Sequence, residues 1–153
     1  MTEGYRIGYW RFSAWFVGLS LAIPAASIAL KAATGLELGQ FAGSIVPIII
    51  AAMQEGVHFA RGTKRVPTGK ERLLLARMLT AIAVAWSSVL FFVVFLLARP
   101  GAELLIGILG PTVIFGAILV MILVMFFMAW LFVGIGSKNE MKLLAKNIAK
   151  DFE

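Results

Sequence analysis

The sequence predicts an all-α integral membrane protein with four transmembrane helices, both termini in the cytoplasm and a C-terminal amphipathic helix. Of its 153 residues, 61% are hydrophobic and 14% are charged, and the mean hydropathy is +0.95. A typical soluble domain is about 45–50% apolar and about 25% charged, so both values differ in the direction expected for a chain in a bilayer. A helix needs about 20 apolar residues to cross the hydrocarbon core. The predicted spans lie at about 10–33, 38–60, 69–97 and 103–136.

The distribution of Lys and Arg predicts the orientation of the chain. With four spans, the N-terminus, the middle connection and the C-terminus share one side, where twelve of the fourteen basic residues fall, against Lys31 and Arg99 on the other side. An excess of Lys and Arg in short loops marks the cytoplasmic side. The net charge of +6 therefore indicates orientation. It does not indicate nucleic-acid binding, which would need a soluble basic face with interleaved aromatic residues.

The first span, 10–33, resembles a signal peptide because Arg6 and Arg11 precede an apolar run. The chain stays apolar after this run, so we interpret it as a retained anchor. The second span, 38–60, has the weakest apolar character, since Pro47 interrupts it and polar residues follow.

The third span begins with a capping box formed by Thr68 and Glu71, in which each side chain bonds to the other residue's backbone N–H. A helix over 69–97 is about 45 Å long, which exceeds the hydrocarbon core. Its first two turns, up to Arg77, should therefore project into the cytoplasm.

The fourth stretch is longer than one crossing requires. Gly110-Pro111 divides it into a short segment, 102–109, and a full span, 112–135. The short segment is either a kinked extension or an interfacial helix.

A second capping box, Ser137 to Glu140, predicts a separate cytoplasmic amphipathic helix over 137–153, distinct from the transmembrane bundle of 1–136. Its apolar residues recur at helical spacing on one side, and its lysines occupy a neighbouring arc. This helix lies on an anionic membrane surface or is covered by a partner protein. The apolar residues are Met141, Leu144, Ile148 and Phe152, and the lysines are Lys138, Lys142, Lys146 and Lys150.

Helix packing is expected where small residues allow two backbones to approach closely. Gly39 and Gly43 lie on one face of the second helix, and Thr80 and Ser87 form a small, weakly polar face on the third. We interpret these residues as a packing seam.

The second helix also carries the polar cluster Gln54, Glu55, His58 and Arg61. The simplest interpretation is a local ion pair at the cytoplasmic boundary, and the alternative is proton or ion handling, because ionisable groups at membrane depth are often functional.

Glu-x-x-His also occurs in di-iron bundles, but these need two such motifs, and this chain has one His. We therefore expect no metal and no cofactor. With no Cys and one His, a catalytic triad is not expected either, so we predict that the protein is not an enzyme.

Bulky aromatic residues surround most of the fourth helix, among them Phe126, Phe127 and Trp130. Such a surface contacts lipid or docks against a larger membrane complex.

One segment resembles a family of small bacterial inner-membrane proteins that has no assigned activity. The resemblance rests on Glu55-Gly56, Phe59 and Arg61, followed by the stretch 65–71, although Thr63-Lys64 stands where that family's pattern has Gly. It implies a multi-pass protein of the bacterial cytoplasmic membrane.

Taken together, these features predict a non-enzymatic accessory or scaffolding subunit of a larger membrane complex, in contact with the lipid bilayer. The alternative is a small homo-oligomeric transporter or channel that uses Gln54, Glu55 and His58.

Overall fold

The computed structural model describes residues 8–35, 40–97 and 99–150, and within these ranges it is helical apart from short connections. The all-helical prediction is confirmed, and the helices lie close to the predicted stretches. They are α1 (Tyr9–Thr34), α2 (Gln40–Thr63), α3 (Gly69–Leu97) and α4 (Arg99–Lys150).

Three segments of the described chain are long and apolar enough to cross a membrane, namely Tyr9–Thr34, Gly69–Val93 and Gly110–Ile148. The chain is therefore a multi-pass membrane protein. The helix that falls outside this group is α2, in which polar residues follow Pro47. A membrane crossing by α2, and with it the sidedness of the two termini, stays a prediction.

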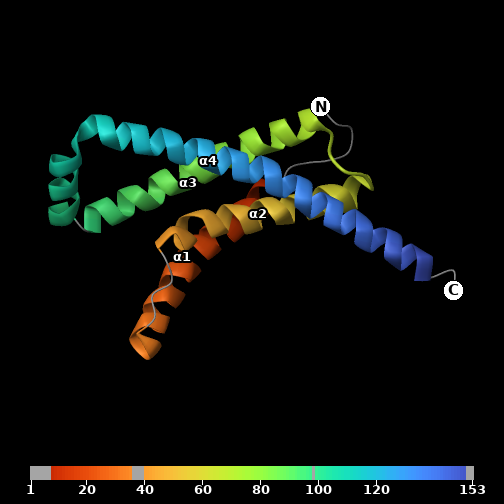
Figure 1. Cartoon of the computed structure of the whole chain (residues 1–153), viewed down its shortest axis with the longest axis horizontal. Helices are drawn as coiled ribbons and strands as arrows, with labels where there is room; N and C mark the ends of the chain where they lie inside the picture. The colour runs from red at the N-terminus through yellow and green to blue at the C-terminus, as the bar shows by residue number, and fades with distance from the viewer. Residues whose placement is uncertain (1–7, 36–39, 98, 151–153) are drawn as a thin grey trace.

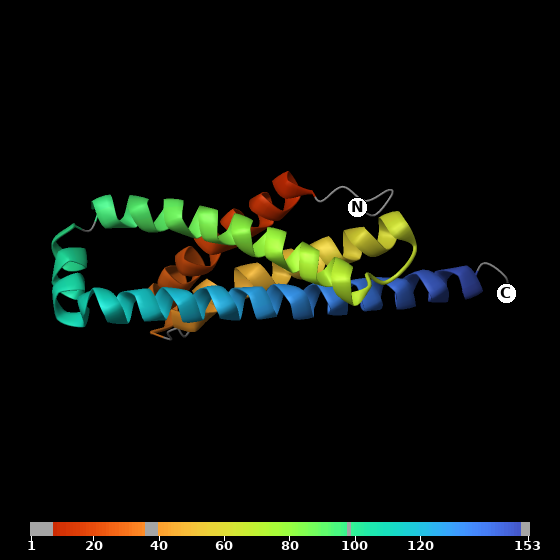
Figure 2. The same ribbon diagram turned by 90° about the horizontal axis from the view of Figure 1, so that it is seen from above.

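The helix α2 lies between α1 and α4 (Figures 1 and 2) and packs mainly against α4. The helix α3 packs on α4 and has little contact with α2. Because neighbouring helices cover much of α2, it does not need to be apolar on every face. This arrangement accounts for the weak apolar character of α2.

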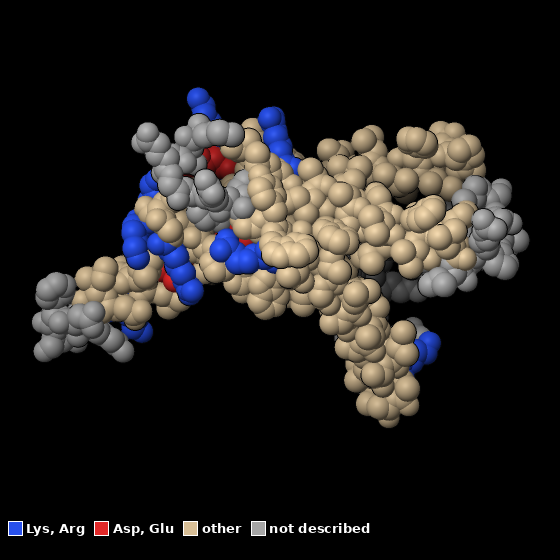
Figure 3. All heavy atoms as spheres, turned by 180° about the vertical axis from the view of Figure 1, so that it is seen from behind, with Lys and Arg blue, Asp and Glu red and all other residues tan. Residues whose placement is uncertain are grey.

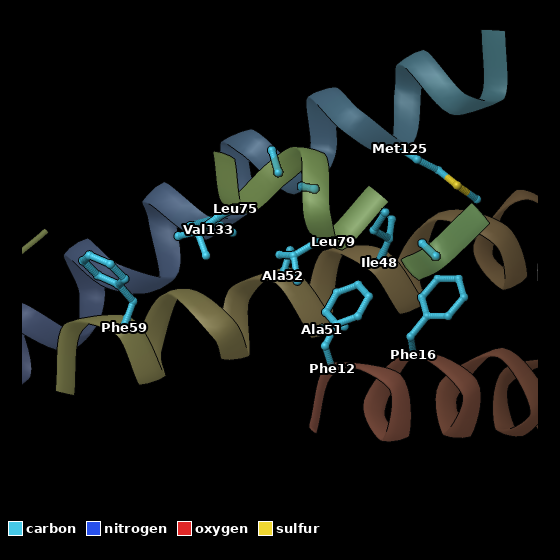
Figure 4. Packing of buried hydrophobic residues seen from close by; sticks show 13 residues of the cluster. Phe12, Phe16, Ile48, Ala51, Ala52, Phe59, Leu75, Leu79, Met125 and Val133 are labelled. Carbon is cyan, nitrogen blue, oxygen red and sulfur yellow. The ribbon is translucent and has the colours of Figure 1, made fainter. Parts of the chain in front are cut away.

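Alanines, phenylalanines and larger aliphatic side chains form the core (Figure 4). Phe12 and Phe16 of α1 stack with ring centroids 5.9 Å apart and point toward Ala51 and Ile48 of α2. Lipid tails are as apolar as these side chains, so close van der Waals packing holds the helices together in a bilayer. Small residues permit such packing, and the fully buried alanines are Ala51, Ala52, Ala60, Ala76, Ala83 and Ala129.

A kink divides α4 at the predicted position. Gly110 has φ 70° and ψ 155°, a positive-φ conformation that favours glycine, and Pro111 follows it. The segment before the kink runs crosswise at one end of the bundle, from α3 to the long part of α4 (Figures 1 and 2). This direction favours the interfacial interpretation of 102–109 over a kinked extension of the span.

From Pro111 the helix continues to Lys150 without another break. The capping box predicted at Ser137 is therefore wrong. The buried Ser137 hydroxyl donates a hydrogen bond to the carbonyl of Gly134 within the helix, at 3.0 Å. The amphipathic segment is thus an extension of α4, and its last turns project beyond the other helices (Figure 2). We call residues 141–150 the arm.

Candidate functional site

Charged residues gather at the end of the molecule from which the arm projects (Figure 3). Most of the remaining surface in this view is uncharged, apart from basic atoms at the far end of α1, where Lys31 lies in the last turn. We call the first region the charged end and define it by Arg11, Glu55, Arg61, Arg72 and Glu140.

Glu55 joins α1 to α2 at the charged end. Its side chain is 1% exposed, and its Oε1 lies 3.5 Å from Nη2 of Arg11. A carboxylate removed from water is strongly disfavoured unless a cation or hydrogen-bond donors compensate it. Arg11, at the start of α1, supplies a compensating positive charge to the buried carboxylate of Glu55.

Arg61 joins α2 to α4. Its Nε donates a 2.7 Å hydrogen bond to Oε1 of Glu140, whose side chain is 8% exposed. This hydrogen bond raises the pKa of Arg61 above its ordinary value. The buried carboxylate of Glu140 thus has a charged donor as its partner.

The connection between α2 and α3 is closed by Arg65 and Glu71. Both terminal nitrogens of Arg65 lie 2.7 Å from the carboxylate of Glu71, a two-bond geometry that raises the pKa of Arg65. The capping box is confirmed, because the Thr68 N–H donates to Glu71 at 2.8 Å and the Glu71 N–H donates to the Thr68 hydroxyl at 3.4 Å. The Arg65 guanidinium also lies 5.4 Å from the ring centroid of Phe59.

Arg72 joins α3 to α4. Its guanidinium lies 5.8 Å from the centroid of the Trp130 ring, and its Nε donates to the carbonyl of Pro67 at 3.5 Å. It also lies against Gly134, where an added Cβ would come within 2.7 Å of Nη1. Arginine side chains therefore make the α1–α2, α2–α4 and α3–α4 junctions at this end.

Two glycines let α2 and α4 approach closely beside these contacts. A Cβ at Gly56 would lie 2.3 Å from the carbonyl oxygen of Val133, and one at Gly136 would lie 2.3 Å from that of Met53. Atoms this close would clash, so only glycine fits at either position with the backbones as they are.

The predicted polar cluster is divided between different helix contacts. Glu55 and Arg61 pair with Arg11 and Glu140, on α1 and α4. Gln54 and His58 are half-buried, and within the described residues neither forms a hydrogen bond or an ion pair. That Gln54, Glu55 and His58 belong to one transport site stays a prediction.

The predicted seam between the second and third helices is only partly described. Gly39 and the surroundings of Gly43 lie outside the described residues. Thr80 is buried and Ser87 half-buried on α3, a helix that has little contact with α2. The close approach seen in the structure lies instead between α2 and α4.

The predicted partner or lipid surface is exposed to different degrees. Phe127 and Ile148 are exposed, whereas Phe126, Trp130, Met141 and Leu144 are half-buried. The lysines Lys138, Lys142 and Lys146 are exposed, and Phe152 and the side chain of Lys150 lie outside the described residues.

Sequence reasoning missed Arg11, Glu140 and the glycine pair. Ala52, Gly56 and Ala60 recur every four residues, and all three are buried against other helices. This small-xxx-small spacing was a usable signal. Glu140 could not be found in the same way, because its spacing from Ser137 also fits an N-cap.

No protein-family model matches this chain, and neither the curated proteins nor the solved structures give a match. The resemblance to small bacterial inner-membrane proteins stays a prediction.

Proposed function

We propose that this chain is a non-enzymatic accessory or scaffolding subunit of a larger complex in the bacterial inner membrane. The observation that carries the proposal is α4, which is one unbroken helix from Pro111 to Lys150. Just before the arm, Gly136 lies against the backbone of Met53 and Glu140 bonds to Arg61. A segment fixed in this way is preorganised, so it loses less conformational entropy when a partner docks on it.

The arm carries both exposed apolar and exposed basic side chains. Leu143 and Ile148 are exposed, and Lys142 and Lys146 are exposed beside them. The arm continues the helix of the candidate span Gly110–Ile148, so we expect it to leave the bilayer along the helix axis and not to lie in the membrane plane. This direction favours a protein partner over the lipid surface. By the charge asymmetry, we place both termini and the arm in the cytoplasm.

Purification in a mild detergent followed by native mass spectrometry tests the proposal. We expect the chain to co-purify with larger subunits in fixed stoichiometry. Changing Leu143→Asp and Ile148→Asp together should release it from them, whereas the control Lys31→Gln, at the other end of the molecule, should not. A lone chain or a homo-oligomer would contradict the proposal.

One observation favours a transporter as a second candidate. The Glu55 side chain is 1% exposed, and a buried carboxylate in a membrane protein is a common feature of ion pathways. In that case Glu55→Gln and His58→Ala should each change a proton or ion flux across proteoliposomes. Unchanged flux in both variants, or no flux in the parent protein, would remove this candidate.

A further inference from the structure

The helix α3 has an outward face that begins with two cations. Leu75, Ala76 and Leu79 are buried and mark the side of α3 that faces the protein. Lys70 and Arg77 are seven residues apart, so they lie nearly in line along the helix, about 10 Å from each other and on the opposite side. Both are exposed.

These two cations have no acidic partner among residues 8–35, 40–97 and 99–150. Neither Lys70 nor Arg77 forms a hydrogen bond or an ion pair in the part of the chain that the structure describes. The nearest acid in sequence, Glu71, is already bound by Arg65 and Thr68. Both cations are therefore available to an anion from outside.

Apolar side chains lie on the same outward face. Leu73 and Leu74, between the two cations, are exposed. Beyond Arg77 this face continues through Ala81 to Phe92, which is 60% exposed. Phe92 lies fifteen positions after Arg77, so this stretch is about 22 Å long, most of the thickness of a hydrocarbon core of about 30 Å. If this apolar stretch lies in the hydrocarbon core, Arg77 is at the level where headgroups meet acyl chains.

We propose that Lys70 and Arg77 bind the phosphate headgroup of an anionic phospholipid whose acyl chains lie along the outward face of α3. The planar guanidinium of Arg77 can bond two phosphate oxygens, and Lys70 adds a second charge farther from the hydrocarbon. Long basic side chains reach the headgroup layer readily from helix ends. An acidic protein could pair with the cations but would leave the exposed apolar side chains between Ala81 and Phe92 uncovered. This site is independent of the proposed scaffolding function.

Native mass spectrometry of the full-length protein tests this site, using phosphatidylglycerol and phosphatidylcholine with identical acyl chains as probes. We expect the wild-type protein to bind phosphatidylglycerol more tightly. Arg77→Gln should reduce that preference about fivefold, and adding Lys70→Gln should reduce it further by a similar factor. The matched control changes Lys142→Gln and Lys146→Gln on the arm, which removes two charges and should leave the preference unchanged.

A conservative variant separates loss of binding from loss of folding. Arg77→Lys keeps the charge but loses the two-bond geometry, so we expect a preference between those of wild type and Arg77→Gln. The site is contradicted if the double Gln variant keeps the wild-type preference or the arm control loses as much. It is also contradicted if an acidic peptide, or inorganic phosphate at equal concentration, displaces the lipid.

Discussion

Arg61 and Glu140, separated by 79 positions in the sequence, meet through a 2.7 Å hydrogen bond that joins α2 to α4. The two partners differ in environment, since the Arg61 side chain is 59% exposed and that of Glu140 only 8%. Loss of Arg61 therefore leaves a buried carboxylate without its cation, whereas loss of Glu140 leaves a guanidinium that is already largely in water.

We predict that Arg61→Gln lowers the midpoint of thermal unfolding more than Glu140→Gln does, when both are measured in the same detergent. Combining the two substitutions should recover part of the loss, because the double variant has no uncompensated buried charge. Equal effects, or the reverse order, would contradict the asymmetry in burial, and strictly additive effects in the double variant would contradict a contact that holds α2 against α4.

The glycine contacts give a second prediction. Gly56→Ala and Gly136→Ala should each destabilise the protein by about 1–3 kcal/mol, because the new methyl group would push the two backbones apart. Unfolding with increasing denaturant measures the change. The control is Gly116→Ala in the same helix α4, where an added Cβ meets no atom within 4 Å. It should be neutral or stabilising by up to about 1 kcal/mol, since alanine favours helix more than glycine does. If all three variants change the stability by the same amount, the close approach of α2 and α4 at Gly56 and Gly136 is contradicted.

The start of α3 gives a third prediction. Thr68→Ala removes the hydroxyl that accepts the Glu71 N–H and should cost about 1 kcal/mol of stability, while Thr68→Ser should keep most of it. The same denaturant series measures both variants. A cost in Thr68→Ser as large as that in Thr68→Ala would argue against the cap.

The sequence was sufficient to predict where the long helices lie and how α2 connects to α3, but it did not predict that α4 continues past Ser137. Apolar stretches bounded by charged groups located the long helices, and local signals located the cap at Thr68 and the kink at Gly110. These features depend on neighbours in the chain, so sequence spacing reveals them.

Contacts between distant segments were harder to predict. Ser137 and Glu140 have the spacing of a cap, but tertiary packing buries both inside a continuous helix. The partner of Glu140 lies on another helix, so no local pattern distinguishes Arg61 from the other arginines at this end. The partner of Glu55, Arg11, is distant in sequence for the same reason.

The continuity of α4 gives a fourth prediction, on which the two interpretations of Ser137 differ. Lys138→Pro would be tolerated if Ser137 were an N-cap, since proline is favoured at the first helical position. Within a continuous helix it should cost about 3 kcal/mol, because it removes a hydrogen bond and clashes with the preceding turn. Thermal unfolding distinguishes the two outcomes, and Lys142→Gln serves as the control for lost charge.

The most direct test of the rigid arm is the distance between spin labels on α4. The chain has no Cys, so Leu123→Cys and Asn147→Cys, both at exposed positions, introduce unique labelling sites. The two labels are 24 positions apart, so a continuous helix predicts a narrow distance distribution centred at about 36 Å in lipid nanodiscs. A broad distribution, or one centred well below that value, would mean that α4 bends at Ser137 and that the arm is not held in place.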